Sequence, residues 1–407
     1  MPDSAVPARS RRVRRCIVWS LCGASAVAMA VAAWSSCGLH EVAGPWREDI
    51  TRAPGAALEE VAVEDGGKYR WERRATLAGG SKQICDITSS QGGLLVAASR
   101  SALEENGAAI CRLTESGEVE TLLEWSGQGF LRAHVHGTRL VVPDADAPFS
   151  VIQFAFRWHV DGYVFISDER GILDQASRET LPAVYHVFDT ARLREGRLVA
   201  SAGAYPAGET AYFSDHAPAA LFVDGCRGEP WHRVLEYPGS EAHGVSRFTY
   251  LQPLDDGSVL AGVQTSRSDL PAAVRISGLP DAPAVEPVRG LDGETLRWAS
   301  WRGAVYHVAQ GQDTTVLSIS RDGGMSFSEL RVPEPQSLAP ARDALFLLAG
   351  GALWKSLDGE TFFPVAPAHP SLAHEPSTLV SAPLAAHLGR LFAGSPRTGE
   401  VLELVRS

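Results

Sequence analysis

Lysine is almost absent from this chain of 407 residues, in which only Lys68, Lys82 and Lys355 occur. The formal net charge is -11, so the sequence does not predict the concentrated basic face that binds nucleic-acid phosphates. No long amphipathic helical stretch follows residue 67, whereas the chain contains 39 glycines and 25 prolines. This composition argues against nucleic acid as a partner and favours an all-β fold of many short strands joined by turns.

Cysteine is also scarce after the N-terminal segment, where only Cys85, Cys111 and Cys226 occur, so a dense disulfide framework is excluded. Cys85 and Cys111 fall on expected strands that are not neighbours, which favours two buried free thiols over a disulfide. The sequence lacks a phosphate-binding glycine loop, a nucleophile-elbow serine, a zinc-binding His-Glu motif and paired Cys-x-x-Cys ligands. It therefore predicts no cofactor and no metal, and it favours binding over catalysis.

The first 37 residues have the pattern of a targeting segment. Five arginines lie between residues 9 and 15, and residues 16–34 are apolar or small throughout. The end of this run resembles a bacterial lipobox, which makes Cys37 a lipidation candidate; an uncleaved membrane anchor and a cleaved signal peptide are the alternatives. Residues 38–67 read as a linker. The expected location is the bacterial cell envelope, with secretion as the alternative.

An eight-residue turn pattern begins at residue 320 and reads Ser-Arg-Asp-Gly-Gly-Met-Ser-Phe. A shorter copy begins at residue 356, and each copy follows a strand-like run. An aspartate can accept backbone N–H bonds in such a turn, and glycine permits a positive φ. The residues that define the two copies are Ser320, Asp322, Gly324, Phe327, Ser356, Asp358 and Phe362. The pattern resembles the Asp-box of sialidase-type β-propellers, in which it joins the two outer strands of a blade.

Repetition along the rest of the chain agrees with that resemblance. Short hydrophobic runs recur seven times, at residues 93–98, 139–142, 197–201, 257–262, 304–308, 345–350 and 390–394. Each run reads as the second of four antiparallel strands, so residues 68–407 are expected to form a seven-bladed β-propeller, with six or eight blades as alternatives. The last unit has only three strands, and we expect the run at residues 69–77 to supply its missing outer strand.

Sialidases bind a carboxylate with three arginines at the propeller mouth, and their first blade carries an Arg-Ile-Pro motif. That motif does not occur in this chain. Arg132, Arg247 and Arg297 do fall on expected inner strands, and guanidinium groups are suited to clamping a carboxylate. The resemblance implies these three arginines as candidates, but without the motif it does not predict sialidase catalysis.

Further candidates for a ligand-binding face are histidines and aspartates. His186 and Asp189 lie on the expected inner strand of the third blade, and His136 lies on that of the second. Asp144 and Asp146 belong to an insertion at residues 143–160. A long loop on a rigid scaffold often carries a binding site. The inner-strand groups can instead satisfy one another around a solvated channel, and the insertion can be a passive cover.

The resulting prediction is an exported, membrane-tethered propeller that acts as a monomer and binds a glycan or protein ligand without converting it. One alternative is a glycan-acting hydrolase or lyase of the sialidase-like superfamily, which requires at least two carboxylates with an arginine or tyrosine at the channel mouth. The other is a structural component of an envelope complex, which requires an exposed apolar patch on one side of the propeller.

Overall fold

A computed structural model describes most of the chain beyond the expected targeting segment. The described residues are 58–77, 83–99, 107–125, 129–145, 161–168, 170–205, 216–225, 230–238, 244–374 and 380–407. The predictions about Cys37, the apolar run at residues 16–34 and Asp146 therefore lie outside the described residues. Within the described residues, no helix is both long enough and apolar enough to cross a bilayer.

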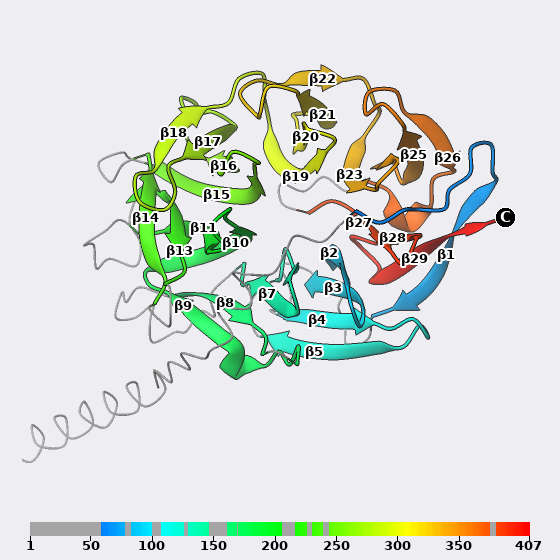
Figure 1. Ribbon diagram of the computed structural model, residues 1–407, viewed down its shortest axis with the longest axis horizontal. Coiled ribbons are helices and arrows are strands. Elements are labelled where there is room, and N and C mark those ends of the chain that lie inside the picture. The colour runs from blue at the N-terminus through cyan, green and yellow to red at the C-terminus, as the bar shows by residue number, and fades with distance from the viewer. Residues whose placement is uncertain are drawn as a thin grey trace, which may run out of the picture. The chain divides into compact units, whose positions relative to one another are not determined.

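Seven antiparallel sheets form a ring around a central axis, as Figure 1 shows. The strands of the first three blades are β2 (Gln83–Ser90), β3 (Gly93–Ser99), β4 (Ala108–Leu113) and β5 (Val119–Trp125); β6 (His134–His136), β7 (Arg139–Pro143), β8 (Gly162–Ile166) and β9 (Arg178–Leu181); and β10 (Val184–Arg192), β11 (Leu198–Ala204), β13 (Ala219–Val223) and β14 (His232–Tyr237). The short helix η1 (Gln175–Ser177) precedes β9.

The other four blades repeat the arrangement. Their strands are β15 (Gly244–Pro253), β16 (Val259–Thr265), β17 (Ala273–Ser277) and β18 (Ala284–Pro287); β19 (Glu294–Trp301), β20 (Ala304–Gln310), β21 (Thr315–Ser320) and β22 (Ser328–Leu330); β23 (Pro335–Pro340), β24 (Leu345–Ala349), β25 (Ala352–Ser356) and β26 (Phe363–Ala366); and β27 (Leu384–His387), β28 (Arg390–Gly394), β29 (Glu400–Arg406) and β1 (Tyr69–Thr76). The two-residue β12 (His216–Ala217) adds a parallel pairing to β15, and helix η3 (Pro370–Leu372) follows β26.

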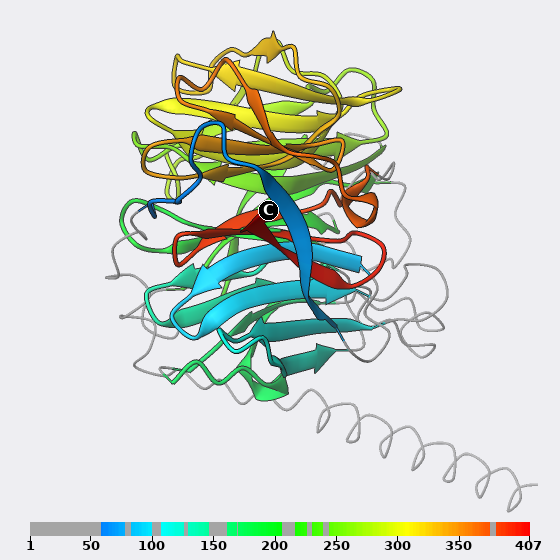
Figure 2. The ribbon, with the colours of Figure 1, turned by 90° about the vertical axis from the view of Figure 1, so that its right-hand side faces the viewer.

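Closure of the ring follows the prediction from the sequence. Strand β1 pairs with β29 from Tyr69–Arg406 to Thr76–Glu400, with one register shift after Arg73, and Figure 2 shows the two strands side by side. The N-terminal strand thus completes the last blade and covers what would be an open sheet edge. The seven-blade count and the assignment of all seven second strands are confirmed.

The strand order defines two faces of the propeller. On the lower face, the chain turns between the first and second strands and between the third and fourth strands of each blade. On the upper face lie the starts of the inner strands and the connections from second to third strands. Both turns that resemble an Asp-box join third to fourth strands, β21 to β22 and β25 to β26, so they lie on the lower face.

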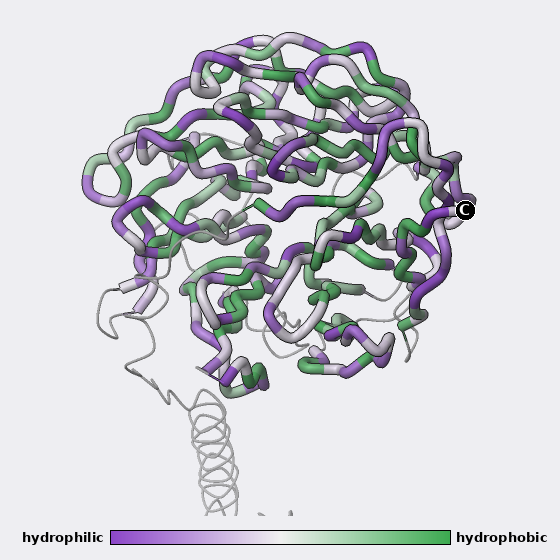
Figure 3. Tube along the Cα trace, turned by 45° about the vertical axis from the view of Figure 1, so that its right-hand side comes forward, coloured by the Kyte–Doolittle hydropathy of each residue, from purple (hydrophilic) through white to green (hydrophobic). Residues whose placement is uncertain are grey.

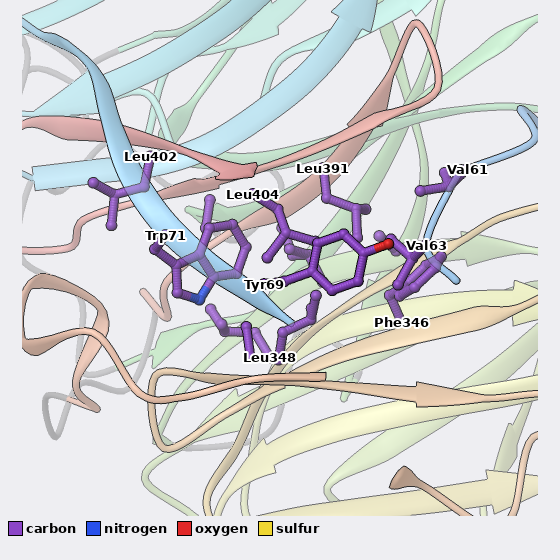
Figure 4. Close-up of a cluster of buried hydrophobic side chains, with 14 of the residues drawn as sticks. Val61, Val63, Tyr69, Trp71, Phe346, Leu348, Leu391, Leu402 and Leu404 are labelled. Carbon is purple, nitrogen blue, oxygen red and sulfur yellow. The ribbon is translucent and has the colours of Figure 1, made fainter. Parts of the chain in front are cut away.

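The blades are held together by apolar side chains packed between adjacent sheets. Middle strands such as β3, β11 and β24 are buried along their whole length because a neighbouring blade covers each side. Green hydrophobic segments accordingly run through the interior in Figure 3. At the closure, Val61, Val63, Tyr69 and Trp71 pack with Phe346 and Leu404 in one cluster, drawn in Figure 4. Part of the expected linker therefore packs between the sixth and seventh blades.

Candidate functional site

An ionic cluster lies at the centre of the ring, where three inner segments meet. Asp86 on β2 accepts hydrogen bonds from the Nη1 atoms of Arg132 (3.3 Å) and Arg297 (2.7 Å), both through Oδ1. Each of the three residues is only 7% exposed. The second carboxylate oxygen accepts from the backbone N–H of Ala133 at 3.2 Å. Two guanidinium groups and one backbone amide therefore hold this carboxylate in place.

The two arginines are fixed by further contacts. Arg132 donates from Nη2 to the Leu296 carbonyl at 3.2 Å, and its guanidinium lies 4.1 Å from the ring centroid of Tyr250. Arg297 donates from Nη2 to the Cys85 carbonyl. Burial raises the pKa of Asp86, and the charge of Arg132 opposes that shift. Each of the two arginines is also bonded to a backbone carbonyl, so the cluster has the character of a structural ion-pair network and not of an open catalytic site. We call Asp86, Arg132 and Arg297 the ionic lock.

An apolar cluster fills the channel beside this lock. It consists of Cys85, Leu131, Ala145, Phe188, Tyr250 and Val380, with Trp298 packed against it, and these residues come from six of the seven blades. Side chains from six blades can share one cluster only at the axis. Apolar side chains therefore occupy the axis at this level.

Cys85 is a buried free thiol, as the sequence predicted, and so is Cys111. Burial raises the pKa of Cys85 to about 12, and the nearby charge of Asp86 acts in the same direction. The thiol is therefore protonated at neutral pH and is not a nucleophile. Cys226 lies outside the described residues.

His134 and Asp189 form a second polar pair near the axis. His134 Nε2 lies 2.6 Å from Asp189 Oδ1, and Asp189 also accepts the backbone N–H groups of Thr190 and Leu251, each at 2.9 Å. Asp189 is 2% exposed. The ring of His136 stacks on His134 with a centroid distance of 5.9 Å, and burial lowers the pKa of His136 to about 3. This aspartate bonds the inner strands of three successive blades to one another.

A third group of polar side chains lies near the upper ends of first and second strands, on the upper face. Arg247 donates from Nη1 to Gln264 Oε1 at 3.2 Å, and Gln264 donates from Nε2 to Glu294 Oε2 at 3.1 Å. The Arg247 guanidinium lies 5.5 Å from the ring centroid of Tyr185. We call Tyr185, Arg247, Gln264 and Glu294 the upper-face row. All four are half-buried, and together they cross the third, fourth and fifth blades.

His186 stands beside this row. Its Nδ1 atom contacts the Ala145 carbonyl, and its ring lies 4.8 Å from that of Tyr185. Burial lowers the pKa of His186 to about 3, and the charge of Arg247 adds to the effect. The imidazole is therefore neutral at physiological pH, and it acts by packing against Tyr185.

The structure separates the three candidate arginines. Arg132 and Arg297 meet at Asp86, whereas Arg247 contacts Tyr185 and Gln264 instead. Asp144 is fully buried and accepts a hydrogen bond from Trp125 Nε1 at 2.8 Å. Sequence reasoning did not single out Asp86, Tyr250, Gln264 or Glu294, because none belongs to a local motif. The available signal was a polar residue within an apolar inner strand, as Asp86 is in Ile84–Ile87.

In each of the two turns on the lower face, an aspartate accepts two backbone N–H groups that follow it in the chain. Asp322 Oδ1 accepts the N–H groups of Met325 and Ser326 at 3.0 Å, and Asp358 Oδ1 accepts those of Glu360 and Thr361 at 2.8 Å. Although burial acts to raise the pKa of Asp322, hydrogen bonds led by that of the Ser326 hydroxyl lower it to about 2. The aspartates stabilise the turns and face no channel group.

Glycine is required in the second turn. Gly359 has φ +82°, and a Cβ there would lie 2.0 Å from the Tyr306 hydroxyl. The aromatic residues that close the turns differ in burial, because Phe327 is buried and Phe362 is partly buried. The turn geometry agrees with the Asp-box resemblance, while membership of the sialidase-like superfamily stays a prediction.

The lower face also carries a shallow depression of about 590 Å³ between the third and fourth blades. Its lining includes Arg194, Glu195, Asp256 and Ser277 from three turns. Asp256 is already bound to the Arg275 guanidinium and to Ser258. No group of three or more metal-ligating side chains occurs among the residues that the structure describes.

Comparisons with known proteins agree on the architecture. No family model matches the chain, and no curated protein matches its sequence. Among solved structures, a streptogramin B lyase superimposes with a TM-score of 0.55 at 10% identity, covering 83% of this chain and 98% of that one. The virginiamycin B lyase from Staphylococcus aureus gives 0.56 at 8%, covering 84% and 100%. The WD40 domain of Neurospora crassa Pan2 gives 0.53 at 6%, covering 82% and 94%.

These identities are low enough that the likeness shows the fold alone. The described residues define a seven-bladed β-propeller, and its function has to be argued from its own side chains.

Proposed function

We propose that this protein is a non-catalytic binding module, exported and held at the membrane by its N-terminal segment, whose ligand contacts the upper-face row. The observation that carries the proposal is the hydrogen bonding of the two channel carboxylates, Asp86 and Asp189. Asp86 is buried and bonded to Arg132, Arg297 and a backbone amide, and Asp189 is buried and bonded to His134 and two backbone amides. Neither carboxylate has the open approach that a general acid or a nucleophile needs.

The upper-face row has the chemistry of a recognition surface. The row combines a tyrosine ring, against which Arg247, His186 and Tyr205 pack, with a guanidinium, an amide and a carboxylate. A sugar ring presents C–H groups for stacking and hydroxyls that donate and accept hydrogen bonds. An oligosaccharide is therefore the ligand class that this combination fits best.

Binding to a glycan microarray tests the proposal, with the full chain as the probe. We expect signal on a subset of oligosaccharides, and loss of that signal in Arg247→Ala. The matched control is Arg267→Ala, which removes another arginine from the upper face, one that is paired with Asp269 at 2.6 Å. Equal binding by wild type and Arg247→Ala would contradict the assignment of the row.

One observation favours the alternative of a glycan-acting hydrolase or lyase. Two carboxylates, two arginines and Tyr250 do gather in this propeller, although inside the channel and not at its mouth. Incubation with fluorogenic glycosides separates the two functions. Our proposal expects no release of the fluorophore, whereas turnover that disappears in an Asp86→Asn variant that is still folded would establish the enzyme.

A further inference from the structure

The upper-face row contains one basic and one acidic side chain, and neither forms an ion pair. Among the described residues, no carboxylate lies within ion-pair distance of Arg247, and no basic group lies within that distance of Glu294. Gln264 lies between them, because its Oε1 atom accepts from Arg247 Nη1 at 3.2 Å and its Nε2 atom donates to Glu294 Oε2 at 3.1 Å. The amide of Gln264 therefore separates two opposite charges that are close neighbours.

Half-buried arginines elsewhere in the described propeller do pair with carboxylates. Examples are Arg112 with Glu120, Arg197 with Asp224 and Arg275 with Asp256. This arrangement is the usual one, because a charge that is partly removed from water loses hydration, and a counter-charge compensates for the loss. Arg247 and Glu294 are both half-buried and depart from it, so the row holds two charges whose compensation the fold does not supply.

Unbonded polar atoms at the two ends of the row have the same signs as the charges. Arg247 Nε is buried and has no acceptor, and Gln310 Oε1 is buried and has no donor. Gln310 lies directly opposite Glu294 in the pairing of β19 with β20, and its Nε2 atom donates to the Gly311 carbonyl at 3.2 Å, which orients the amide. The fourth-blade end of the row is therefore electropositive and the fifth-blade end electronegative.

The spacing of the two charges limits what can bridge them. The oxygen and nitrogen of one amide are about 2.3 Å apart, so Arg247 Nη1 and Glu294 Oε2 are no more than about 8.6 Å apart. A charge-assisted hydrogen bond of about 2.8 Å at each end leaves a gap of about 3 Å or less. A ligand whose carboxylate oxygen and ammonium nitrogen are about 3–5 Å apart can therefore contact both ends at once.

The signs of the two charges select among saccharides. A neutral saccharide leaves both charges without a counter-charge. An acidic saccharide compensates Arg247 but brings its carboxylate toward Glu294, and a basic one compensates Glu294 but brings its ammonium group toward Arg247. A saccharide that carries both groups, with the carboxylate toward the fourth blade and the ammonium toward the fifth, compensates both.

We propose that the ligand of the upper-face row is a zwitterionic saccharide, which carries a free ammonium group and a carboxylate on the same sugar unit. This inference rests on the proposed function, which places a saccharide at the row. Arg247 donates hydrogen bonds to the carboxylate, Glu294 accepts them from the ammonium group, and Gln264 keeps these two partners at a fixed spacing.

Titration of the full chain with three related sugars, followed by saturation-transfer NMR, tests the inference. Muramic acid carries an amine and a lactyl carboxylate on neighbouring ring carbons. N-acetylmuramic acid lacks the ammonium group, and glucosamine lacks the carboxylate. At a mildly acidic pH, at which the free amines are protonated, we expect the wild type to bind muramic acid at least about tenfold more tightly than either of the other sugars.

Two variants assign each charge of the sugar to its partner. In Glu294→Gln, muramic acid is expected to lose its advantage over N-acetylmuramic acid, and in Arg247→Gln it is expected to lose its advantage over glucosamine. The matched control is Glu334→Gln, which removes an exposed carboxylate from the connection between β22 and β23 on the upper face and should leave both ratios unchanged. A ratio of two affinities does not depend on the fraction of protein that is folded, so a destabilised variant still gives an answer.

The other outcomes separate this inference from the proposed function. If oligosaccharides bind on the microarray through Arg247 but muramic acid has no advantage, the proposed function stands and the zwitterionic ligand is wrong. If neither the microarray nor these sugars give binding, the proposed function fails, and this inference fails with it. An advantage over N-acetylmuramic acid that persists in Glu294→Gln would overturn the assignment of the ammonium group. Alanine that binds as tightly as muramic acid would overturn the saccharide, because the charges alone would then account for binding.

Discussion

Substitution of Asp86 by asparagine is the sharpest test of the ionic lock. Asparagine has nearly the same shape as aspartate, so the change leaves no cavity, but it removes the negative charge that Arg132 and Arg297 share at 3.3 and 2.7 Å. Both arginines are 7% exposed and cannot turn to bulk water without moving the inner strands. Breaking a buried ion pair by removing one partner costs about 3–5 kcal/mol.

The expected result is therefore a loss of about 3–5 kcal/mol in the free energy of unfolding, measured by urea denaturation at pH 7.5. The control is Glu360→Gln, which breaks an exposed pair with Arg321 and is expected to cost about 1 kcal/mol or less. A double-mutant cycle with Arg297→Gln isolates the coupling between the two residues. A cost for Asp86→Asn no larger than that of the control would refute the lock. It would mean that Asp86 is already neutral in the fold, which is the state expected of a catalytic acid.

Three further predictions follow from the turns, a buried histidine and the N-terminal segment. Asp322→Ala is expected to lower the free energy of unfolding by about 0.5–2 kcal/mol and to leave glycan binding unchanged; a folded variant that no longer binds would contradict this. Burial lowers the pKa of His307 to about 3, so its stabilisation is complete above about pH 6.5 and is lost as pH falls toward 3, by up to about 1.4 kcal/mol per pH unit. In urea denaturation between pH 7.5 and 5, the free energy of unfolding should decline less steeply for His307→Gln than for the wild type. Equal slopes would contradict the role of His307. If Cys37 is lipidated, radiolabelled palmitate should enter the wild type and not Cys37→Ala, and label that persists in the variant would rule out the lipobox.

Local sequence patterns were sufficient to predict the fold. The recurrent second strands predicted seven blades because a strand covered on both sides must be apolar along its length, and that property is visible residue by residue. The closing strand was predictable from a three-stranded last unit and a strand-like run near the start. The hydrogen-bond acceptors of the turns at Asp322 and Asp358 were also predictable, since their partners lie within four residues along the chain.

The sites required tertiary structure because their members come from different blades. Asp86 and Arg297 are 211 residues apart, and no pattern within one strand indicates that a shared axis brings them together. Arg247 and Arg297 are both the fourth residue of an inner strand, yet Arg247 pairs with Gln264 near the upper end of β16, whereas a register shift after Thr295 places Arg297 opposite Val308, deeper in the channel. Height along the axis is set by the register of each strand, and β-bulges shift that register in most blades. The sequence alone therefore determined how many blades there are and where each one turns. Only the folded ring decided which charges meet inside the channel and which lie at the surface.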